Sequence, residues 1–334
     1  MMQNDIHKYS KYITKITMSA GKKVNIKICF ISFNQGEMTN EHESQTNFEK
    51  KIKDCDIVAL GIQESSSLHT DDNVLVKQIK SILPKHNIES KQMMQGTLGW
   101  LRLIVFHKYQ KSITVASNDI CSLKEPFKGC VYIGLKVGNK RIGLMTVHLP
   151  SSPDKPQKRD ECLNKLVHKY TRNDKPDIII IGGDMNYRTN NIKEIKNDDV
   201  IEMIKNYKCT DNKKTNIIDN MKNELNEKFE DQMNLANIRV DGYKFMEPDI
   251  NFCPTCRYLE KNDKQKETDE HNNQKEQDEY KRIYDPKRYP SWCDRIIVGK
   301  KDDTTAKYKI KSYESHDISD YTDHKAVSAI VTIE

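Results

Sequence analysis

The chain has 334 residues, of which 36% are hydrophobic and 31% are charged, with 55 Lys and Arg against 49 Asp and Glu. This length and composition allow a buried core, and they exclude a collagen-like chain, a small disulfide-rich domain and a protein with several membrane spans. The net charge of +6 does not demand an anionic partner and gives no support for a long nucleic-acid track.

The predicted elements begin after a polar N-terminal extension at 1–24. Apolar runs predict strands at 26–32, 57–63, 101–107, 129–137, 141–148, 177–181, 295–298, 307–313 and 326–333. Helical periodicity predicts helices at 46–53, 74–83, 159–170, 192–205 and 229–238. The hairpin signal at Gly138-Asn139, mixed with crossovers, favours a largely antiparallel α/β arrangement.

Three further features bear on the context of the chain. Residues 260–279 contain no apolar side chain, so we expect a disordered insertion at 260–280. Nine cysteines without regular spacing predict free thiols. The N-terminus lacks the apolar centre of a signal peptide and the C-terminus lacks a cysteine for prenylation, so we expect a cytoplasmic protein.

Polar side chains stand at the ends of several predicted strands. In the clearest example, four consecutive Ile and two Gly are followed by Asp184 and Asn186, whose i, i+2 spacing directs both side chains to one side of an extended chain. The same segment is also typical of an Asp/Asn turn that ends a strand. The other strand-end residues are Asn34, Glu64, His148, Asp294, Asp323 and His324.

Each of these residues has an ordinary structural explanation when it is taken alone, such as a solvated strand end or a hydrogen-bonded core histidine. Two histidines, several carboxylates and two asparagines at strand ends together form the inventory for metal-assisted hydrolysis of a phosphate ester. A hard cation stabilises charge on a phosphoryl oxygen, a carboxylate takes a proton from water, and a histidine held by a carboxylate donates to the phosphate.

Two segments carry a family resemblance. Gly183-Asp-Met-Asn-Tyr-Arg188 and Pro290-Ser-Trp-Cys-Asp-Arg295 look like the GD-[hydrophobic]-N-[aromatic]-R and P-[A/S]-W-C-D-R motifs of the inositol polyphosphate 5-phosphatases. The chain therefore resembles this family, within the Mg²⁺-dependent endonuclease/exonuclease/phosphatase superfamily, over about 26–333. It departs from the pattern at Phe33, at Thr146-Val147 and at Cys256-Arg257, where the family has Trp, Asn-Ser, and an aromatic residue before Lys.

The resemblance implies an α/β fold of the DNase I-like type, a two-sheet β-sandwich core flanked by helices. It places one catalytic domain at 25–334 and the site at one rim between the sheets. It also implies Mg²⁺-dependent removal of the 5-phosphate from inositol polyphosphates, phosphoinositide lipids or both, by direct attack of water.

The roles implied for individual residues follow the matched motifs. Asp184 is the expected general base, Asn186 positions the water or the phosphate, and Asp294 orients a charged His324. His148 binds the scissile phosphate from the other side. The expected Mg²⁺ ligands are Glu64 and Asn34, with Asp323 as a further candidate. The expected phosphate-binding cations are Lys128, Lys158, Arg159, Arg188, Arg257 and Arg288. The alternative for each is a surface residue that only aids solubility, and for Lys158 the two explanations carry equal weight.

For lipid substrates, Leu98-Gly99-Trp100-Leu101 is a candidate apolar lip because Trp favours a membrane interface. Packing at a strand start is the alternative, and only transient peripheral membrane contact is expected. Two other functions stay open: a nuclease or sphingomyelinase-like hydrolase of the same superfamily, and a non-catalytic phosphoinositide-binding module. The sequence does not decide between soluble and lipid substrates, and it is silent on oligomeric state.

Overall fold

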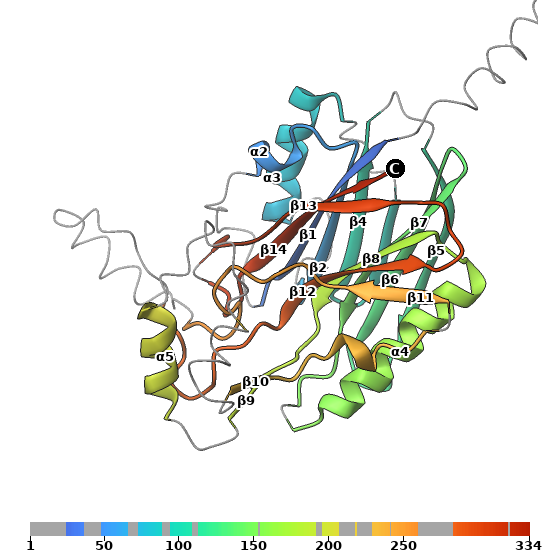
Figure 1. Cartoon of the computed structure of the whole chain (residues 1–334). Coiled ribbons are helices and arrows are strands. Elements are labelled where there is room, and N and C mark those ends of the chain that lie inside the picture. The colour runs from blue at the N-terminus through green and yellow to red at the C-terminus, as the bar shows by residue number, and fades with distance from the viewer. Residues whose placement is uncertain are drawn as a thin grey trace, which may run out of the picture.

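Two six-stranded sheets packed face to face form the body of the molecule (Figure 1). The computed structural model describes residues 25–36, 48–65, 73–88, 94–108, 113–152, 154–191, 196–206, 218, 229–240, 242–259, 283–319 and 321–334. The first sheet comprises β1 (Ile26–Asn34), β2 (Ile57–Gln63), β3 (Met94–Leu98), β4 (Leu101–His107), β13 (Tyr308–His316) and β14 (Ala326–Ile333), in the order β13-β14-β1-β2-β4-β3.

The second sheet comprises β5 (Ile113–Ser122), β6 (Gly129–Val137), β7 (Lys140–His148), β8 (Ile178–Asp184), β11 (Tyr243–Met246) and β12 (Asp294–Lys301), in the order β11-β12-β8-β7-β6-β5. The short strands β9 (Thr189–Asn191) and β10 (Phe229–Asp231) pair with each other. The pairs β1–β2 and β7–β8 are parallel and the other paired strands are antiparallel, so both sheets are mixed.

Alternation along the central strands explains the layering. In β1, Ile28 and Phe30 face the cluster between the sheets, whereas Cys29 and Ile31 face the outer cluster. The sheets approach each other closely where Phe30 meets Gly182 of β8: a Cβ atom added to this glycine would lie 2.5 Å from the Phe30 ring. The glycine there therefore lets the two layers meet.

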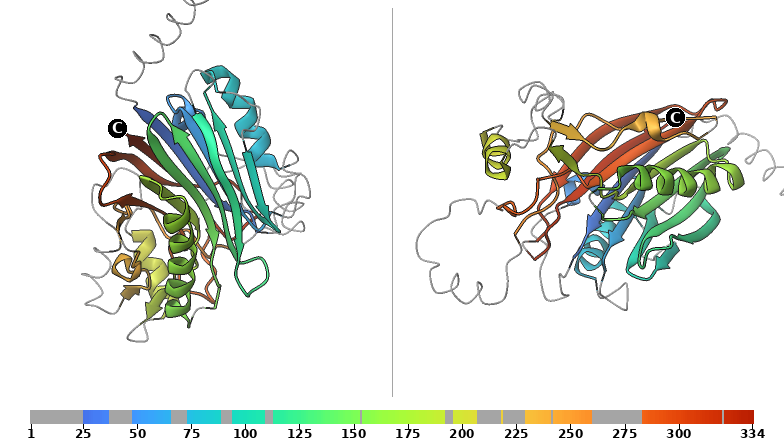
Figure 2. Two further views of the ribbon diagram at one scale, coloured as in Figure 1. Left: turned by 90° about the vertical axis from the view of Figure 1, so that its right-hand side faces the viewer. Right: turned by 90° about the horizontal axis from the view of Figure 1, so that it is seen from below.

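Helices cover the outer faces of both sheets (Figure 2). The first sheet is covered by α2 (Glu49–Ile52), α3 (Val74–Ile82) and the 3-10 turn η2 (Leu83–His86), and the second by α4 (Pro156–Asn173). Leu163, Leu166 and Val167 of α4 belong to the same buried cluster as Ile179 and Ile181 of β8. The remaining described elements are α5 (Asn197–Asn206) and the 3-10 turn η3 (Leu235–Asn237).

The predicted two-sheet sandwich flanked by helices is confirmed. The helix predicted at 229–238 is wrong, because this segment forms β10 and η3; Asn234 accepts a hydrogen bond from the backbone of Ala236, a local bond that competes with a longer helix. The prediction of free thiols is wrong at Cys253, which is disulfide-bonded, whereas seven other described cysteines are free.

The extension at 1–24 and the insertion at 260–280 lie outside the described residues. Among the residues that the structure does describe, no helix has both the length and the apolar character needed to span a bilayer.

Candidate active site

Polar residues from both sheets converge at one rim of the sandwich. The sequence-predicted set comprises Asn34 at the end of β1, Glu64 after β2, His148 at the end of β7, Asp184 at the end of β8, Asp294 at the start of β12, and Asp323 with His324 before β14. The strand register explains why they meet: Asp184 is opposite His148 on one neighbouring strand and opposite Asp294 on the other.

Asp184 lies at the centre of this group and is only 2% exposed. Its Oδ2 accepts a hydrogen bond from Asn34 Nδ2 at 2.9 Å and lies 3.5 Å from His148 Nε2 and 4.0 Å from His324 Nε2. Burial alone would raise the pKa of Asp184, but the surrounding cationic groups, His324 first among them, hold that pKa at about 2. Asp184 is therefore an ionised acceptor at neutral pH.

His148 forms one flank of Asp184. Its Nε2 lies 3.4 Å from Glu64 Oε1 and is in close contact with the Lys128 ammonium group. Burial lowers the pKa of His148 to about 3, and burial also lowers the pKa of Lys128. This flank therefore presents a neutral imidazole beside a lysine.

His324 forms the other flank, and its Nδ1 lies 2.7 Å from Asp294 Oδ2. Burial works against its charged form, but Asp294 beside it holds the pKa of His324 well above the ordinary value. Burial raises the pKa of Asp294 to about 6, still below neutral pH. The Asp294 backbone N–H donates to Thr255 Oγ1 at 3.1 Å. This flank therefore presents a charged imidazole.

The residues near Glu64 suit a hard divalent cation. Ligand atoms of Glu64, His148 and Asp184 lie within 4.8 Å of one another, and two of the three residues are carboxylates, which magnesium and calcium prefer. The Glu64 side chain is 40% exposed and its backbone has φ 55°, an uncommon conformation for a residue other than glycine. These residues therefore fit a metal that enters from solvent.

The other two predicted ligands are placed differently. Asn34 directs its amide nitrogen to Asp184, and its oxygen accepts a hydrogen bond from the backbone of Gly36 at 3.0 Å. Asp323 reaches the site beside His324, with Oδ1 3.7 Å from His324 Nε2, and its carboxylate does not belong to the Glu64 group.

The predicted phosphate-binding cations separate into two groups. Lys128 contacts His148. Arg188 donates to Asn186 Oδ1 at 2.6 Å, and Arg257 Nε lies 2.9 Å from Asp323 Oδ2. Lys128 and Arg188 therefore stand near the central carboxylate, and Arg257 stands at Asp323, on the side of His324.

The other three predicted cations are less directly connected to the centre. Arg288 lies near Asp285, to whose carbonyl it donates its backbone N–H. Lys158 points to Glu125 on the surface. Arg159 is fully buried, donates to the Ser152 carbonyl at 2.5 Å, and therefore holds the loop after β7.

Sequence reasoning missed Thr255, which supports Asp294 from a loop, and Cys256, whose sulfur lies 3.3 Å from Arg188 Nη1. Cys256 stands at one of the departures from the family pattern, and this is the signal that could have identified it together with its neighbour Thr255. Arg295, which follows Asp294, forms its ion pairs with Asp231 and Glu247.

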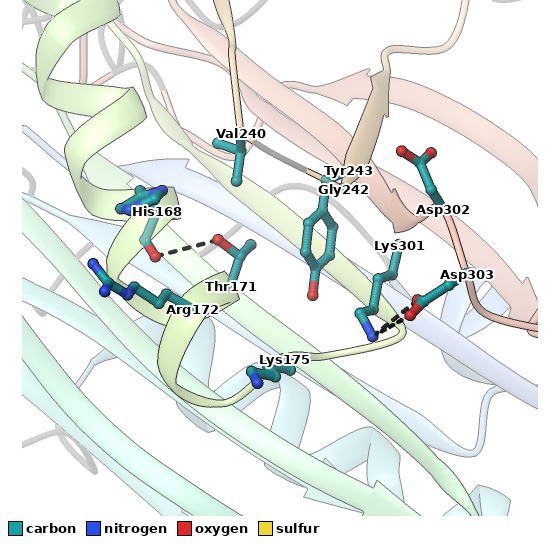
Figure 3. A pocket seen from close by; sticks show the side chains of 10 residues that line it. All are labelled: His168, Thr171, Arg172, Lys175, Val240, Gly242, Tyr243, Lys301, Asp302 and Asp303. Carbon is teal, nitrogen blue, oxygen red and sulfur yellow. Dashed lines mark hydrogen bonds and ion pairs between the residues drawn. The ribbon is translucent and has the colours of Figure 1, made fainter.

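A separate hollow of about 630 Å³ lies at the opposite end of the second sheet (Figure 3). It is lined by residues around the end of α4, the start of β11 and the end of β12, with Tyr243 between α4 and Lys301. Lys301 forms an ion pair with Asp303 at 2.8 Å. None of the converging strand-end residues lines this hollow, so we place the candidate chemistry at the other rim.

Comparisons with known proteins agree with this geometry. A model of the endonuclease/exonuclease/phosphatase family 2 matches residues 31–330. Type IV inositol polyphosphate 5-phosphatase 11 of Arabidopsis thaliana is 23% identical over 324 residues, which cover 93% of this chain and 84% of the relative. The predicted resemblance to the inositol polyphosphate 5-phosphatases is thus confirmed.

Two solved structures share the fold. One is the inositol polyphosphate 5-phosphatase domain of SPsynaptojanin in complex with inositol (1,4)-bisphosphate and a calcium ion, with TM-score 0.66, 21% identity, and coverage of 98% of this chain and 90% of that chain. The other is Cimex nitrophorin as a ferrous NO complex, with TM-score 0.59, 16% identity, and coverage of 93% and 99%. Since such different proteins share the fold, function has to be argued from the site.

Proposed function

The chain belongs to the endonuclease/exonuclease/phosphatase family 2, and on this premise we propose that it is a Mg²⁺-dependent phosphatase of inositol polyphosphates or phosphoinositides. The observation that carries the proposal is the ionised carboxylate of Asp184 between a neutral and a charged imidazole, beside the exposed Glu64. A base, a cation and a metal-binding acid at one point are the requirements of phosphate-ester hydrolysis.

In the proposed reaction, Asp184 takes a proton from water, because its low pKa keeps it ionised and its carboxylate faces the space between the histidines. The charged His324 donates to a phosphoryl oxygen, and Asp294 holds the imidazole in the orientation that this requires. His148 and Lys128 contact the phosphate from the other flank. Water attacks phosphorus directly, and the bond between phosphorus and the inositol oxygen breaks. The inositol oxygen takes up one proton in place of the one that water gives to Asp184, so an inositol hydroxyl and inorganic phosphate are released.

A Mg²⁺ ion held by Glu64, with Asn34 as a further candidate, would stabilise negative charge on the phosphoryl oxygens; the carboxylate of Asp323 lies outside the Glu64 group. Asn186 acts as a positioning residue, since its side chain donates to the Leu149 carbonyl at 3.1 Å and accepts from Arg188. It thereby fixes the loop after His148 and directs one guanidinium group.

We infer the substrate class from the positive charges around the site and from the proteins that this chain resembles. An inositol ring with several phosphates is strongly anionic, and the site contains Lys128, Arg188 and Arg257. A similar structure binds inositol (1,4)-bisphosphate, and a similar sequence is named an inositol polyphosphate 5-phosphatase. We therefore assign the 5-phosphate as the group that is removed.

An exposed aromatic pair supports access to membrane lipids. Trp100 and Phe127 are each 48% exposed and stack with their ring centroids 4.5 Å apart. The Trp100 carbonyl accepts a hydrogen bond from Ser65, the residue after Glu64, and Phe127 precedes Lys128. Because the pair lies beside the proposed site and is not packed in the core, we propose that it contacts the membrane transiently while the protein resides in the cytoplasm.

The test is a phosphate-release panel. Soluble inositol trisphosphate and phosphoinositide vesicles are incubated with the full chain in Mg²⁺ or in EDTA, and phosphorus NMR identifies the position of the phosphate that is lost. We expect Mg²⁺-dependent loss of the 5-phosphate. Nicking of plasmid or cleavage of sphingomyelin without phosphate release would identify a different superfamily hydrolase, and binding without turnover would identify a phosphoinositide-binding module.

A further inference from the structure

One sulfur, one nitrogen and one oxygen ligand converge beside the proposed catalytic carboxylate. We propose that Cys256, Asp323 and His324 form a second metal site, for a thiophilic divalent cation such as Zn²⁺. Their ligand atoms lie within 4.8 Å of one another, and sulfur, nitrogen and oxygen are the ligand types that zinc takes in proteins. This group shares no residue with the group at Glu64.

The orientation of His324 suits metal binding. Its Nδ1 faces Asp294 Oδ2 at 2.7 Å, so Nε2 is the nitrogen directed to Asp323 Oδ1, 3.7 Å away. A histidine that ligates a metal through one nitrogen usually gives the other N–H to a carboxylate, which fixes the ring. The Asp294–His324 pair already has this arrangement.

Asp323 can supply the oxygen ligand. Arg257 Nε contacts its Oδ2 at 2.9 Å, while its Oδ1 is the atom on the side of His324. The Asp323 side chain is 13% exposed, whereas Cys256 is almost fully buried, so a metal would enter from the side of the carboxylate.

Cys256 determines which metal the site would prefer. Thiolate ligands select zinc-like cations over magnesium and calcium, which prefer oxygen. Arg188 Nη1 lies 3.3 Å from the sulfur and can donate to a metal-bound thiolate.

A cation on His324 Nε2 would occupy the nitrogen that lies 4.0 Å from Asp184 Oδ2 and would therefore inhibit hydrolysis. This inhibition rests on the proposed phosphatase function, but the metal binding does not. The two can be separated because cobalt in the site is visible by its absorption spectrum, without any turnover.

The binding experiment titrates the full chain with Co²⁺ in excess Mg²⁺, which occupies the oxygen-rich group at Glu64. We expect a sulfur-to-cobalt charge-transfer band that Zn²⁺ abolishes, that Cys256→Ser removes, and that the matched surface-thiol variant Cys162→Ser retains. Asp323→Asn, which keeps the sulfur, should weaken cobalt binding by about 10- to 100-fold. Absence of the band, or its survival in Cys256→Ser, would overturn the site.

The inhibition experiment measures phosphate release in saturating Mg²⁺ with increasing Zn²⁺, relative to the zinc-free rate of each variant. Cys256→Ser should raise the half-inhibitory zinc concentration by about 10- to 100-fold, and Cys162→Ser should leave it unchanged. Equal zinc sensitivity in both variants would contradict the inhibitory role. If no substrate is hydrolysed, the proposed function fails, and the cobalt spectrum still decides the metal site.

Discussion

Each flank of Asp184 contains a histidine, but one of these histidines is neutral and the other is positively charged. His148 and His324 are both buried, and their Nε2 atoms lie 3.5 and 4.0 Å from the same carboxylate oxygen. His148 has a backbone hydrogen bond with Phe127, and burial lowers its pKa to about 3. His324 has the carboxylate of Asp294 instead, and its pKa is raised despite burial.

Burial alone therefore does not decide the charge of a histidine in this site: Asp294 raises the pKa of His324 despite burial, whereas burial and the neighbouring cations Lys128 and His324 lower the pKa of His148. The result is a neutral ring beside Lys128 and a charged ring beside Asp294. The site thereby combines a neutral and a charged flank around one base.

The largest effect is expected at the centre that both flanks share. Asp184→Asn keeps the shape of the side chain but removes the proton acceptor, so phosphate release should fall by about 10⁴-fold. The control is Asp302→Asn, which alters an exposed carboxylate at the far end of the second sheet and should leave the rate unchanged. A loss of less than tenfold in Asp184→Asn would assign the base elsewhere.

Asp294→Asn should convert the charged flank into a second neutral one. Without the carboxylate, the pKa of His324 should fall, which NMR titration of the imidazole can measure, and phosphate release should drop by about 10³-fold. An unchanged His324 titration would show that Asp294 is not the partner that sets its charge, and the comparison of the flanks would fail.

Two lysine variants test the neutral flank, because one lysine contacts His148 and the other lies on the surface. Lys128→Met removes the cation beside His148 and should lower kcat/KM by about 10²-fold. Lys158→Met alters a surface lysine that pairs with Glu125, and we expect a change within about twofold, as for a surface ion pair. Similar losses in both variants would mean that Lys158 also binds substrate phosphate.

The aromatic pair separates lipid from soluble substrates. Trp100→Ser should reduce the hydrolysis of vesicle phosphoinositide by about tenfold, because an apolar contact with the bilayer is lost. Hydrolysis of soluble inositol trisphosphate should not change. The matched control is Met246→Ser, which removes another exposed apolar side chain, on β11. Equal effects on both substrates would assign Trp100 to packing at the strand start.

The smallest effect concerns a buried histidine outside the site. His316 donates to or accepts from Ser328 Oγ at 2.7 Å, not a carboxylate, and burial lowers its pKa to about 4. Because the folded state favours the neutral ring, its stability contribution is complete above pH 6.5 and is lost as pH falls from 6.5 towards 4. The expected loss is about 1–2 kcal/mol at pH 5.

Urea unfolding at pH 7 and pH 5 measures this loss. His316→Gln should show a smaller drop in the free energy of unfolding between the two pH values than the unmodified chain does. His168→Gln, at an exposed histidine of α4, should show the same drop as the unmodified chain. An identical pH dependence in all three proteins would contradict the assignment to His316.

The buried strands and their polar ends were predictable because each is indicated by a short run of apolar residues followed by a polar one. Four consecutive Ile before Asp184 indicate a buried strand, and the apolar run before Glu64 does the same. The strands β3, β5, β9, β10 and β11 were not predicted, since they lie at sheet edges or in the separate two-stranded pair, where the apolar pattern is weaker. In β5, buried and exposed positions alternate only in part.

The residue pattern by itself does not predict the charge states, because they depend on contacts between distant segments; the charged His324 held by Asp294 was expected only from the family resemblance. The partner of His324 is 30 residues away in the sequence. Lys158 and Arg159 are neighbours on α4, yet one turns to the surface and the other is fully buried, because successive side chains of a helix point about 100° apart. Position in the sequence alone does not show which of these two helix residues faces the core.

We propose that the oxygen of a water activated at Asp184 is transferred to phosphorus, and that the bond between phosphorus and the inositol oxygen is the bond that breaks. The most direct test is a single-turnover reaction with inositol trisphosphate in water labelled with a heavy oxygen isotope, followed by mass spectrometry of both products. The account predicts one labelled oxygen in the released phosphate and none in the inositol product. Label in the inositol product, or phosphate released without label, would contradict it.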